Sequence, residues 1–341
     1  RHLAEREYTG TVILISGEED LVLRATEKLA RTYHLSVAGC LHKPINASAL
    51  LPLLEQSLSG LDESRLKNLN MSLHSYSPEA LREAIAKNQL VNYYQPKVSV
   101  RTGEVIGVET LLRWRHHDDG IVFPDRFIPV AEAYRLIDDL TRWVIKNAFQ
   151  QAKRWSEQGL YLLIAINVSM DNLADLAFAD FIAEEAASVG ISPSSIVFEV
   201  TESRLMQNFA VALNVLTRLR LKRFRLSIDD FGTGHSSLAQ LRDFPFDELK
   251  IDRSFSHRAW KDDRLKAIFE ASLDLAKHLH MDVVAEGIED LDDWVFLRSV
   301  GCHIAQGHFI ARPMPPEHLP AWLNAWQDRL QTEEMLKNPK I

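Results

Sequence analysis

The sequence predicts a (β/α)8 TIM-like barrel with an antiparallel first strand pair, preceded by a shorter α/β segment. Three observations lead to this fold class. Eight strand-like runs alternate with helix-like segments after residue 78, most of these runs end in a polar side chain, and the first sixty residues show the same alternation on a smaller scale. Alternating strands and helices build parallel sheets, and eight such units can close into a barrel.

The first sixty residues predict parallel α/β topology, because each strand-like run is followed by an amphipathic segment. The expected strands are TVILISG (11–17) and VAGCL (37–41), and the expected helices cover 19–33 and 46–58. Ser16 stands at the end of the first strand, and Lys43 and Pro44 follow the second.

A polar stretch at 61–77 is expected to be a helical linker between this segment and the barrel. Ser77, Pro78 and Glu79 then predict a helix start, with serine at the cap and proline in the first turn. The barrel is expected to cover 78–330, and a polar tail 331–341.

The barrel strands are predicted from apolar runs bounded by turn signals. They are 91–99, 104–112, 162–168, 196–201, 224–229, 248–252, 282–287 and 303–309. The first two are joined only by the residues RTG, which is too short for a parallel crossover, so this pair must be antiparallel. Amphipathic segments are expected near 125–158, 172–189, 205–221, 262–280, 291–300 and 316–330.

Polar residues stand at the carboxyl end of seven of these strands, where barrel enzymes carry their catalytic groups. They are Glu109, Asn167, Glu199, Asp229 with Asp230, Lys250, Glu286 and Gln306. Strand alternation places several of them on the same face as an apolar neighbour two residues earlier, which favours convergence inside the barrel. Each alone could be a satisfied core group or a helix cap, but seven together are hard to explain that way.

The run RLSIDDFGTGHSSL (225–238) places two aspartates at the end of one strand. Successive side chains on a strand point to opposite faces, so Asp229 and Asp230 can serve one site only if the chain turns there. Gly232 and Gly234 permit such a turn. The simpler alternative is that Asp230 or Ser236 caps the next helix.

Several carboxylates facing one cavity repel each other, and Lys250 offsets only part of that charge. Divalent cations would balance the rest, and carboxylate and amide oxygens suit Mg²⁺ or Mn²⁺ better than a sulfur-seeking metal. Asp229 and Asp230 can reach two neighbouring positions, which indicates a site for two metal ions about 4 Å apart, and a two-metal site favours phosphoester hydrolysis.

Composition sets limits on other functions. The formal net charge of −8 argues against a nucleic-acid polymer as partner, since that needs clustered positive surface. Cys40 and Cys302 are too few for a disulfide framework or a thiolate metal site, which fits a reducing compartment. Without an apolar run of about 18 residues or a leader-like start, we expect no membrane span and a cytoplasmic location.

An ordered set of motifs over residues 78–326 resembles the EAL-domain cyclic di-GMP phosphodiesterases. The motifs are YYQPKV, GVETLLRW, INVS, FEVTES, SIDDFGTGHSSL, LKIDRSF, AEGIE and AQGHFIARPM. The segment 1–60, with Ser16, Lys43 and Pro44, resembles the second half of a response-regulator receiver domain. Its phosphoacceptor aspartate would lie upstream of Arg1, so the chain as given is not expected to be phosphorylated.

The resemblance implies hydrolysis of cyclic di-GMP to linear pGpG with Mg²⁺ or Mn²⁺, and it assigns roles by position. The implied metal ligands are Glu109, Asn167, Glu199, Asp229 and Asp230. The implied catalytic residues are Glu109, Lys250, Glu286 and Gln306, and the implied substrate contacts are Gln95, Arg113 and Asp252. Glu202 would anchor the loop that carries the two aspartates. A sensor kinase acting on a complete receiver and a homodimer or higher oligomer are the implied protein partners.

Two departures from the family pattern are visible. Thr110 follows Glu109 where alanine is usual, which leaves the metal-binding glutamate in place. His117, Asp118 and Asp119 stand where proline is more frequent, and a solvated turn is favoured there over a metal site. Two alternatives stay open: a sensor that binds cyclic di-GMP without cutting it, and an unrelated barrel metallohydrolase, which does not explain Gln95 and Arg113.

Overall fold

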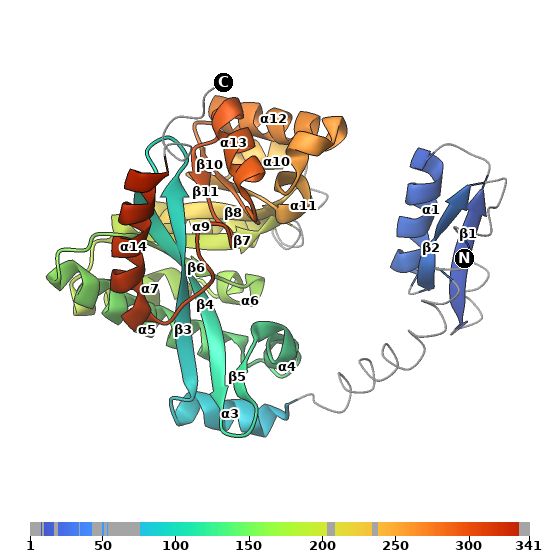
Figure 1. The fold of residues 1–341 in the computed structure, drawn as a ribbon. Coiled ribbons are helices and arrows are strands. Elements are labelled where there is room, and N and C mark those ends of the chain that lie inside the picture. The colour runs from blue at the N-terminus through green and yellow to red at the C-terminus, as the bar shows by residue number, and fades with distance from the viewer. Residues whose placement is uncertain are drawn as a thin grey trace. The chain divides into compact units, whose positions relative to one another are not determined.

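The computed structural model of the chain describes residues 8, 10–16, 20–33, 35–42, 50, 53, 76–202, 209–233 and 238–333. The chain divides into two compact units, Arg1–Ser75 and Tyr76–Ile341. Figure 1 shows both, and each is described by itself. Among the described residues, no helix is long and apolar enough to cross a bilayer.

The first unit contains β1 (Thr11–Ser16), α1 (Asp20–Thr32) and β2 (Ser36–His42). β1 and β2 pair in parallel, which confirms the parallel α/β topology expected here. Ser16 is the last residue of β1. Lys43, Pro44, most of the expected helix at 46–58 and most of the expected linker lie outside the described residues.

The second unit is a closed eight-stranded barrel, which confirms the predicted fold class (Figure 1). Its strands are β3 (Leu90–Ser99), β4 (Val105–His116), β6 (Leu163–Asn167), β7 (Ile196–Thr201), β8 (Arg225–Phe231), β9 (Glu248–Ile251), β10 (Asp282–Ala285) and β11 (Ile304–Ala305). Each corresponds to one of the eight expected strands. β3 runs antiparallel to both of its neighbours, β4 and β11, and the other pairs are parallel.

Helices cover the outside of this barrel. The longer ones are α3 (Pro78–Ala86), α5 (Ile137–Glu157), α7 (Phe178–Val189), α9 (Phe209–Leu221), α12 (Asp263–His278), α13 (Leu291–Val300) and α14 (Leu319–Thr332). α3 begins as expected, because Ser77 Oγ accepts a hydrogen bond from Ala80 N with Pro78 in the first turn. α5 buries Leu140, Val144 and Ala148, which recur at helical spacing, against the barrel.

Three local features differ from the simplest interpretation of the sequence. The segment near 125–158 is broken into α4 (Ile128–Ala133) and α5 by a turn at Arg135, which has a φ of 57°. The segment near 172–189 likewise forms α6 (Met170–Ala174) and α7. A short strand, β5 (Gly120–Val122), pairs with the end of β4 and was not predicted, because three residues carry too little periodicity.

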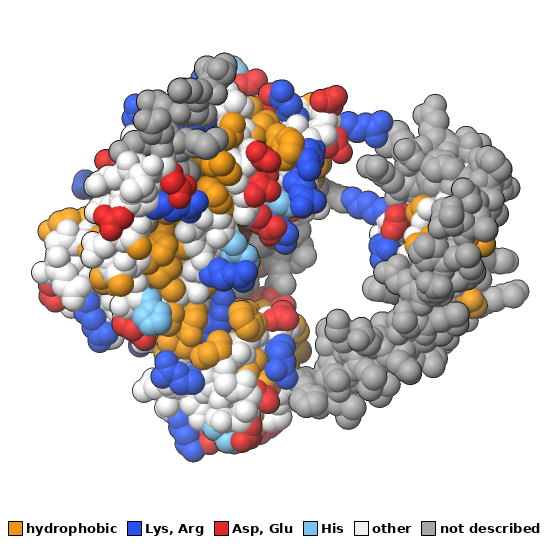
Figure 2. Space-filling view, in the orientation of Figure 1, with side chains coloured by type: hydrophobic (Ala, Val, Ile, Leu, Met, Phe, Trp, Pro, Cys, Tyr) orange, Lys and Arg blue, Asp and Glu red, His pale blue; other side chains and the backbone are white. Residues whose placement is uncertain are grey.

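Short elements also follow two barrel strands: α10 (Leu238–Asp243) after β8, and α11 (Arg253–Ser256) after β9. On the face shown in Figure 2, acidic and basic side chains are interspersed with apolar ones. The interior is different, since several charged residues are almost completely enclosed by the barrel.

Candidate active site

Strand register brings the predicted polar residues to one end of the barrel. Glu109 of β4 lies opposite Gln95 of the antiparallel β3, and Asn167 of β6 lies beside Glu199 of β7. Glu286 and Gln306 directly follow β10 and β11. Gln95, Glu109, Glu286 and Gln306 line one cavity of about 250 Å³ at this end. The predicted convergence of strand ends is therefore present in the structure.

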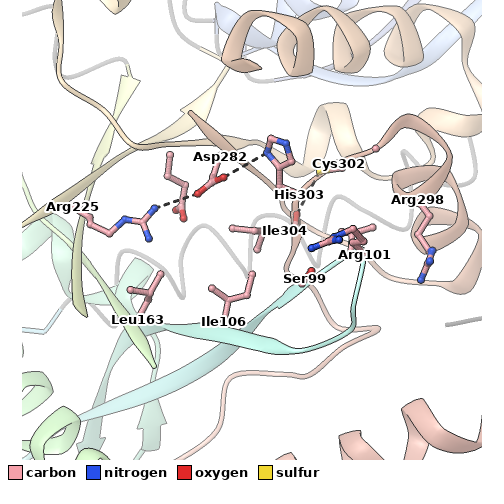
Figure 3. A pocket seen from close by; sticks show the side chains of 13 residues that line it. Ser99, Arg101, Ile106, Leu163, Arg225, Asp282, Arg298, Cys302, His303 and Ile304 are labelled. Carbon is pink, nitrogen blue, oxygen red and sulfur yellow. Dashed lines mark hydrogen bonds and ion pairs between the residues drawn. The ribbon is translucent and has the colours of Figure 1, made fainter. Parts of the chain in front are cut away.

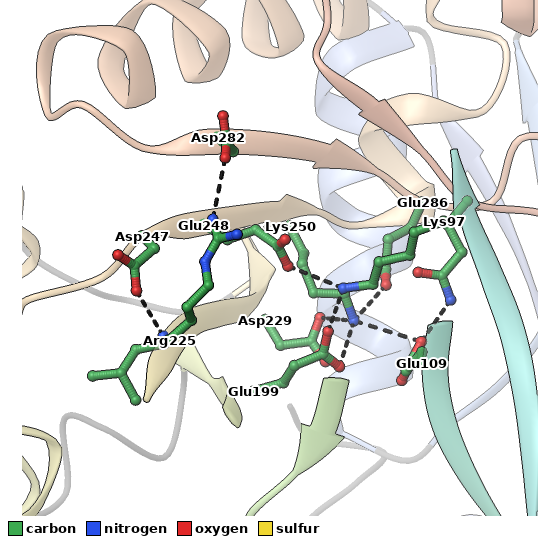
Figure 4. Close-up of polar contacts among 12 residues, drawn as sticks. Lys97, Glu109, Glu199, Arg225, Asp229, Asp247, Glu248, Lys250, Asp282 and Glu286 are labelled. Carbon is green, nitrogen blue, oxygen red and sulfur yellow. Dashed lines mark hydrogen bonds and ion pairs between the residues drawn. The ribbon is translucent and has the colours of Figure 1, made fainter. Parts of the chain in front are cut away.

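Lys250 of β9 lies at the centre of this group, with only 1% of its side chain exposed (Figure 4). Its Nζ atom lies 2.7 Å from Glu286 Oε1, 3.0 Å from Asp229 Oδ1, 3.1 Å from Glu199 Oε2 and 3.8 Å from Glu109 Oε2. Burial by itself would lower the pKa of Lys250, but the surrounding carboxylates hold this pKa well above its ordinary value. Lys250 is therefore a fixed cation among four carboxylates.

A second buried lysine, Lys97 of β3, was given no role from the sequence. Its Nζ lies 2.6 Å from Glu199 Oε1 and 3.0 Å from Glu248 Oε1 (Figure 4). Burial raises the pKa of Glu199, but Lys250 and Lys97 outweigh that effect and lower this pKa to about 2. Glu199 is thus ionised and has a lysine on each carboxylate oxygen.

Amide side chains hold Glu109 from two sides. Asn167 Nδ2 donates to Glu109 Oε1 at 2.9 Å, and Gln306 Nε2 donates to Glu109 Oε2 at 2.6 Å. Gln306 Nε2 also lies 3.1 Å from Gln95 Oε1, while Gln95 Nε2 donates to the carbonyl of Ala311. Burial raises the pKa of Glu109, Lys250 opposes this, and the charges of Glu199 and Asp229 add to the increase.

An irregularity and turn at the end of β8 bring Asp229 and Asp230, both still within this strand, to the same site. Asp230 has a φ of 55°, Gly232 has a φ of 95°, and the β8–β9 register shifts between Ile228 and Phe231. The left-handed residue and the register shift let adjacent side chains serve one side of the strand. Burial first, and then the charge of Asp229, raise the pKa of Asp230. The turn begins at Asp230 itself, earlier than the glycines alone indicate.

Glu202 contacts this turn from the end of β7, because its Oε2 accepts a hydrogen bond from Gly232 N at 2.8 Å. This hydrogen bond agrees with the loop-anchoring role that the resemblance implied for Glu202. Gly234 and Ser236 lie outside the described residues, so the structure does not test whether Ser236 caps the next helix.

The residues present fit a divalent cation. Asp229, Asp230 and Glu286 each offer an oxygen, and these atoms all lie within 4.8 Å of one another. Gln306 Oε1 is buried and has no hydrogen-bond partner among the described residues. Oxygen-only donors suit Mg²⁺ and Mn²⁺.

A second group that could hold a metal consists of His116, His117 and Asp118 at the β4–β5 turn. His116 Nδ1 already accepts from the backbone N–H groups of Asp118 and Asp119. The side chains of His117 and Asp118 are each 74% exposed. These features agree with the solvated turn favoured from the sequence.

Of the expected substrate contacts, Gln95 lines the cavity beside Glu109, whereas Arg113 and Asp252 do not. Arg113 lies four residues beyond Glu109 on β4, on the same strand face, with its guanidinium 4.8 Å from the ring centroid of Phe123 and 5.6 Å from that of Tyr93. Burial lowers the pKa of Arg113. Asp252 caps α11, where its Oδ1 accepts from Ser254 N at 2.9 Å, and its charge contributes to the raised pKa of Asp230.

A barrel with a buried cluster of carboxylates, amides and lysines at its carboxyl strand ends has the arrangement of a barrel enzyme. Residues 78–313 match the model of the EAL domain family. The chain therefore belongs to the EAL-domain family.

Two similar proteins from Pseudomonas aeruginosa are cyclic di-GMP phosphodiesterases by name. The chain is 33% identical over 310 residues to the cyclic di-GMP phosphodiesterase RocR of Pseudomonas aeruginosa, covering 90% of this chain and 78% of that protein. It is 40% identical over 230 residues to the cyclic di-GMP phosphodiesterase PA2567 of the same organism, covering 67% of this chain and 39% of that protein. The match to RocR extends into residues before 78.

A solved structure of the PaMucR phosphodiesterase in complex with c-di-GMP is 39% identical to the chain, with a TM-score of 0.68, and covers 71% of this chain and 98% of that one. Several curated relatives are longer: the chain spans 30%, 31% and 39% of three of them.

Proposed function

We propose that this chain is a phosphodiesterase that uses divalent metal ions to hydrolyse cyclic di-GMP to linear pGpG. The observation that carries the proposal is the buried cluster around Lys250, where four carboxylates converge at the carboxyl strand ends of an EAL-domain barrel. Similarity to relatives named cyclic di-GMP phosphodiesterases supports the choice of substrate.

Glu109, Asn167, Glu199 and Asp229 would hold one Mg²⁺ or Mn²⁺ ion, and Asp229 with Asp230 a second. When bound, such ions polarise a phosphoryl oxygen and lower the pKa of water. Their charge would also offset the repulsion among these carboxylates, of which Lys250 and Lys97 neutralise only a part.

The remaining residues would bind and orient the reactants. Lys250 would hold the phosphate or the attacking water, because its ammonium is fixed by four carboxylates. Gln306 would orient the water through Oε1, which has no partner within the described part of the barrel. The water oxygen would form the new bond to phosphorus while the bond from phosphorus to the ribose oxygen breaks, and the proton that the water gives up would end on that ribose oxygen. Glu286 would accept the proton of the water, or position the groups that do.

The dinucleotide would be held by Gln95, Arg113 and Asp252. The planar guanidinium of Arg113 matches phosphate geometry, and its packing on Phe123 and Tyr93 restricts its orientation. Gln95 lines the cavity beside Glu109 and would donate or accept hydrogen bonds there.

The test is incubation with cyclic di-GMP and Mg²⁺ or Mn²⁺, with products separated by chromatography. We expect pGpG from the wild type, a loss of at least about a hundredfold for Glu109→Ala because a ligand of the metal is removed, and wild-type activity for the exposed control Glu157→Ala. Binding of cyclic di-GMP without product in any metal would instead support the sensor alternative.

The function of the first unit is a separate proposal. We propose that residues 1–60 are part of a receiver domain through which a sensor kinase controls the barrel by way of the 61–77 linker. We also propose that the protein acts in the cytoplasm as a homodimer or higher oligomer. The parallel β1–β2 pair, with Ser16 at the end of β1, supports the receiver. Unchanged turnover after phosphorylation of a longer chain that carries the upstream aspartate would contradict this control.

A further inference from the structure

Lys97 and Glu248 continue the charged cluster toward the opposite end of the barrel. Ion pairs of 3.1 Å, 2.6 Å and 3.0 Å connect Lys250 to Glu199, Glu199 to Lys97, and Lys97 to Glu248. All four side chains are at most 5% exposed. Glu248 begins β9 and lines a cavity of about 480 Å³ at the amino end of the strands, which Figure 3 shows from close by.

A contribution to folding stability does not by itself explain the buried ion pair between Lys97 and Glu248. Branched apolar side chains normally fill the interior of such barrels, and replacing a buried ion pair by apolar residues of similar volume is often neutral or stabilising. The distinctive feature is the position of Lys97, which contacts Glu199 on the oxygen opposite the one facing Lys250. Lys97 lines neither the 250 Å³ cavity nor the 480 Å³ cavity.

We propose that Lys97 is a positioning residue of the phosphodiesterase site: it fixes Glu199 Oε1 so that Oε2 faces Lys250 and the position of the divalent cation. The proposal rests on the function proposed above and adds a residue to it. Glu248 holds Lys97 in turn, at a distance of 3.0 Å. Without Lys97, Glu199 keeps only its contact with Lys250 and its carboxylate can rotate.

Partners that orient a metal ligand typically change metal affinity or activity by about 10- to 100-fold when they are removed. For Lys97→Met we therefore expect a roughly tenfold weaker affinity for Mn²⁺ by titration calorimetry and a similar or larger fall in kcat. The KM for cyclic di-GMP should change less than about threefold, since Lys97 does not line the 250 Å³ cavity beside Glu109. The matched control, Lys153→Met, removes a partly exposed lysine from α5 and should leave all three quantities unchanged.

A double variant separates positioning from stability. Lys97→Met leaves Glu248 buried without its cation, whereas Lys97→Met/Glu248→Met removes both charges. We expect the double variant to melt at a higher temperature than the single variant while its Mn²⁺ affinity stays about tenfold below wild type. If the double variant regained wild-type affinity together with its stability, Lys97 would be structural and the proposal would be overturned. The double variant also serves if Lys97→Met does not fold.

The Mn²⁺ titration needs no substrate, so the two proposals can fail separately. A wild type that binds Mn²⁺ but forms no pGpG contradicts the phosphodiesterase, while the weaker affinity of the Lys97 variants would still support positioning. Wild-type affinity in both Lys97 variants overturns positioning alone. A wild type without measurable Mn²⁺ affinity overturns positioning, while pGpG formation with Mg²⁺ or Mn²⁺ still decides the phosphodiesterase.

Discussion

The two ends of the barrel carry similar charges in very different surroundings. At the carboxyl end, Lys250 is 1% exposed and Glu199 is fully buried. At the amino end, Arg225 and Asp282 form an ion pair of 3.3 Å, but their side chains are 27% and 51% exposed. The cavity at the amino end, seen in Figure 3, has about twice the volume of the one beside Glu109.

The larger cavity therefore lies at the end of the barrel with the exposed charges, and the smaller cavity lies beside the buried ones. Cavity size does not indicate where the candidate site is. Water and salt screen an exposed pair, so it contributes little to stability or chemistry. A buried carboxylate keeps its interactions with neighbouring charges, and these interactions shift its pKa and favour a cation. The end with the smaller cavity therefore has the larger electrostatic effects, and the predictions that follow compare the two ends.

The largest effect is expected for Lys250→Met. Removing the cation leaves Glu109, Glu199, Asp229 and Glu286 without their shared partner, and breaking a buried pair typically costs about 3–5 kcal/mol. We expect urea unfolding of the metal-free variant to show a loss of this order, and the chromatographic assay to show no pGpG. Added Mn²⁺ should recover part of the stability. An unfolding free energy within 1 kcal/mol of wild type would contradict the electrostatic interpretation.

An intermediate effect is expected in the pH dependence of the metal-free protein. Burial, followed by the charges of Asp229 and Glu109, raises the pKa of Glu286 from 4.5 to about 8 despite Lys250. The folded state then holds a proton that the unfolded state has lost, so this contribution to stability is present below about 4.5 and is lost as the pH rises through about 8.

Glu286→Gln removes that titration. We expect melting temperatures measured with a chelator to fall less between pH 5 and pH 8 in the variant than in the wild type. Glu199, with a pKa of about 2, adds the opposite trend at acid pH, because its contribution is lost as the pH falls through that value. Parallel pH profiles of wild type and Glu286→Gln would show that Glu286 does not titrate as described.

Much of the barrel could be predicted because its strands repeat one pattern. All eight barrel strands were found from apolar runs, and the short RTG connection correctly gave an antiparallel first pair. The break at Arg135 was missed, since a positive φ at a residue other than glycine has no reliable sequence signal. The break between α6 and α7 was missed because α6 ends at Asp175 in extended backbone, with a φ of −91° and a ψ of 112°, and neither glycine nor proline marks this position in the sequence. β5 was missed because it depends on pairing with β4, a tertiary contact.

The convergence of the polar side chains was predicted as far as strand ends determine it. Lys97 and Glu248 were missed because they lie below those ends, Lys97 within the antiparallel β3 and Glu248 at the start of β9. Strand alternation contained the signal, since Lys97 shares a face with Gln95, and Glu248 shares one with Lys250. The turn at Asp230 could not be predicted as such, because aspartate adopts positive φ only in particular surroundings.

The smallest effect is expected at the amino end, where Asp282→Asn removes one partner of Arg225. An exposed pair of this kind contributes at most about 1 kcal/mol, so urea unfolding should shift by no more than that, and turnover of cyclic di-GMP should stay at the wild-type value. The same substitution type at Asp229, which is buried beside Lys250, should abolish turnover and provides the matched comparison. If Asp282→Asn reduced turnover as much as Asp229→Asn, charge at the amino end would matter as much as charge at the carboxyl end, and burial would not be what distinguishes them.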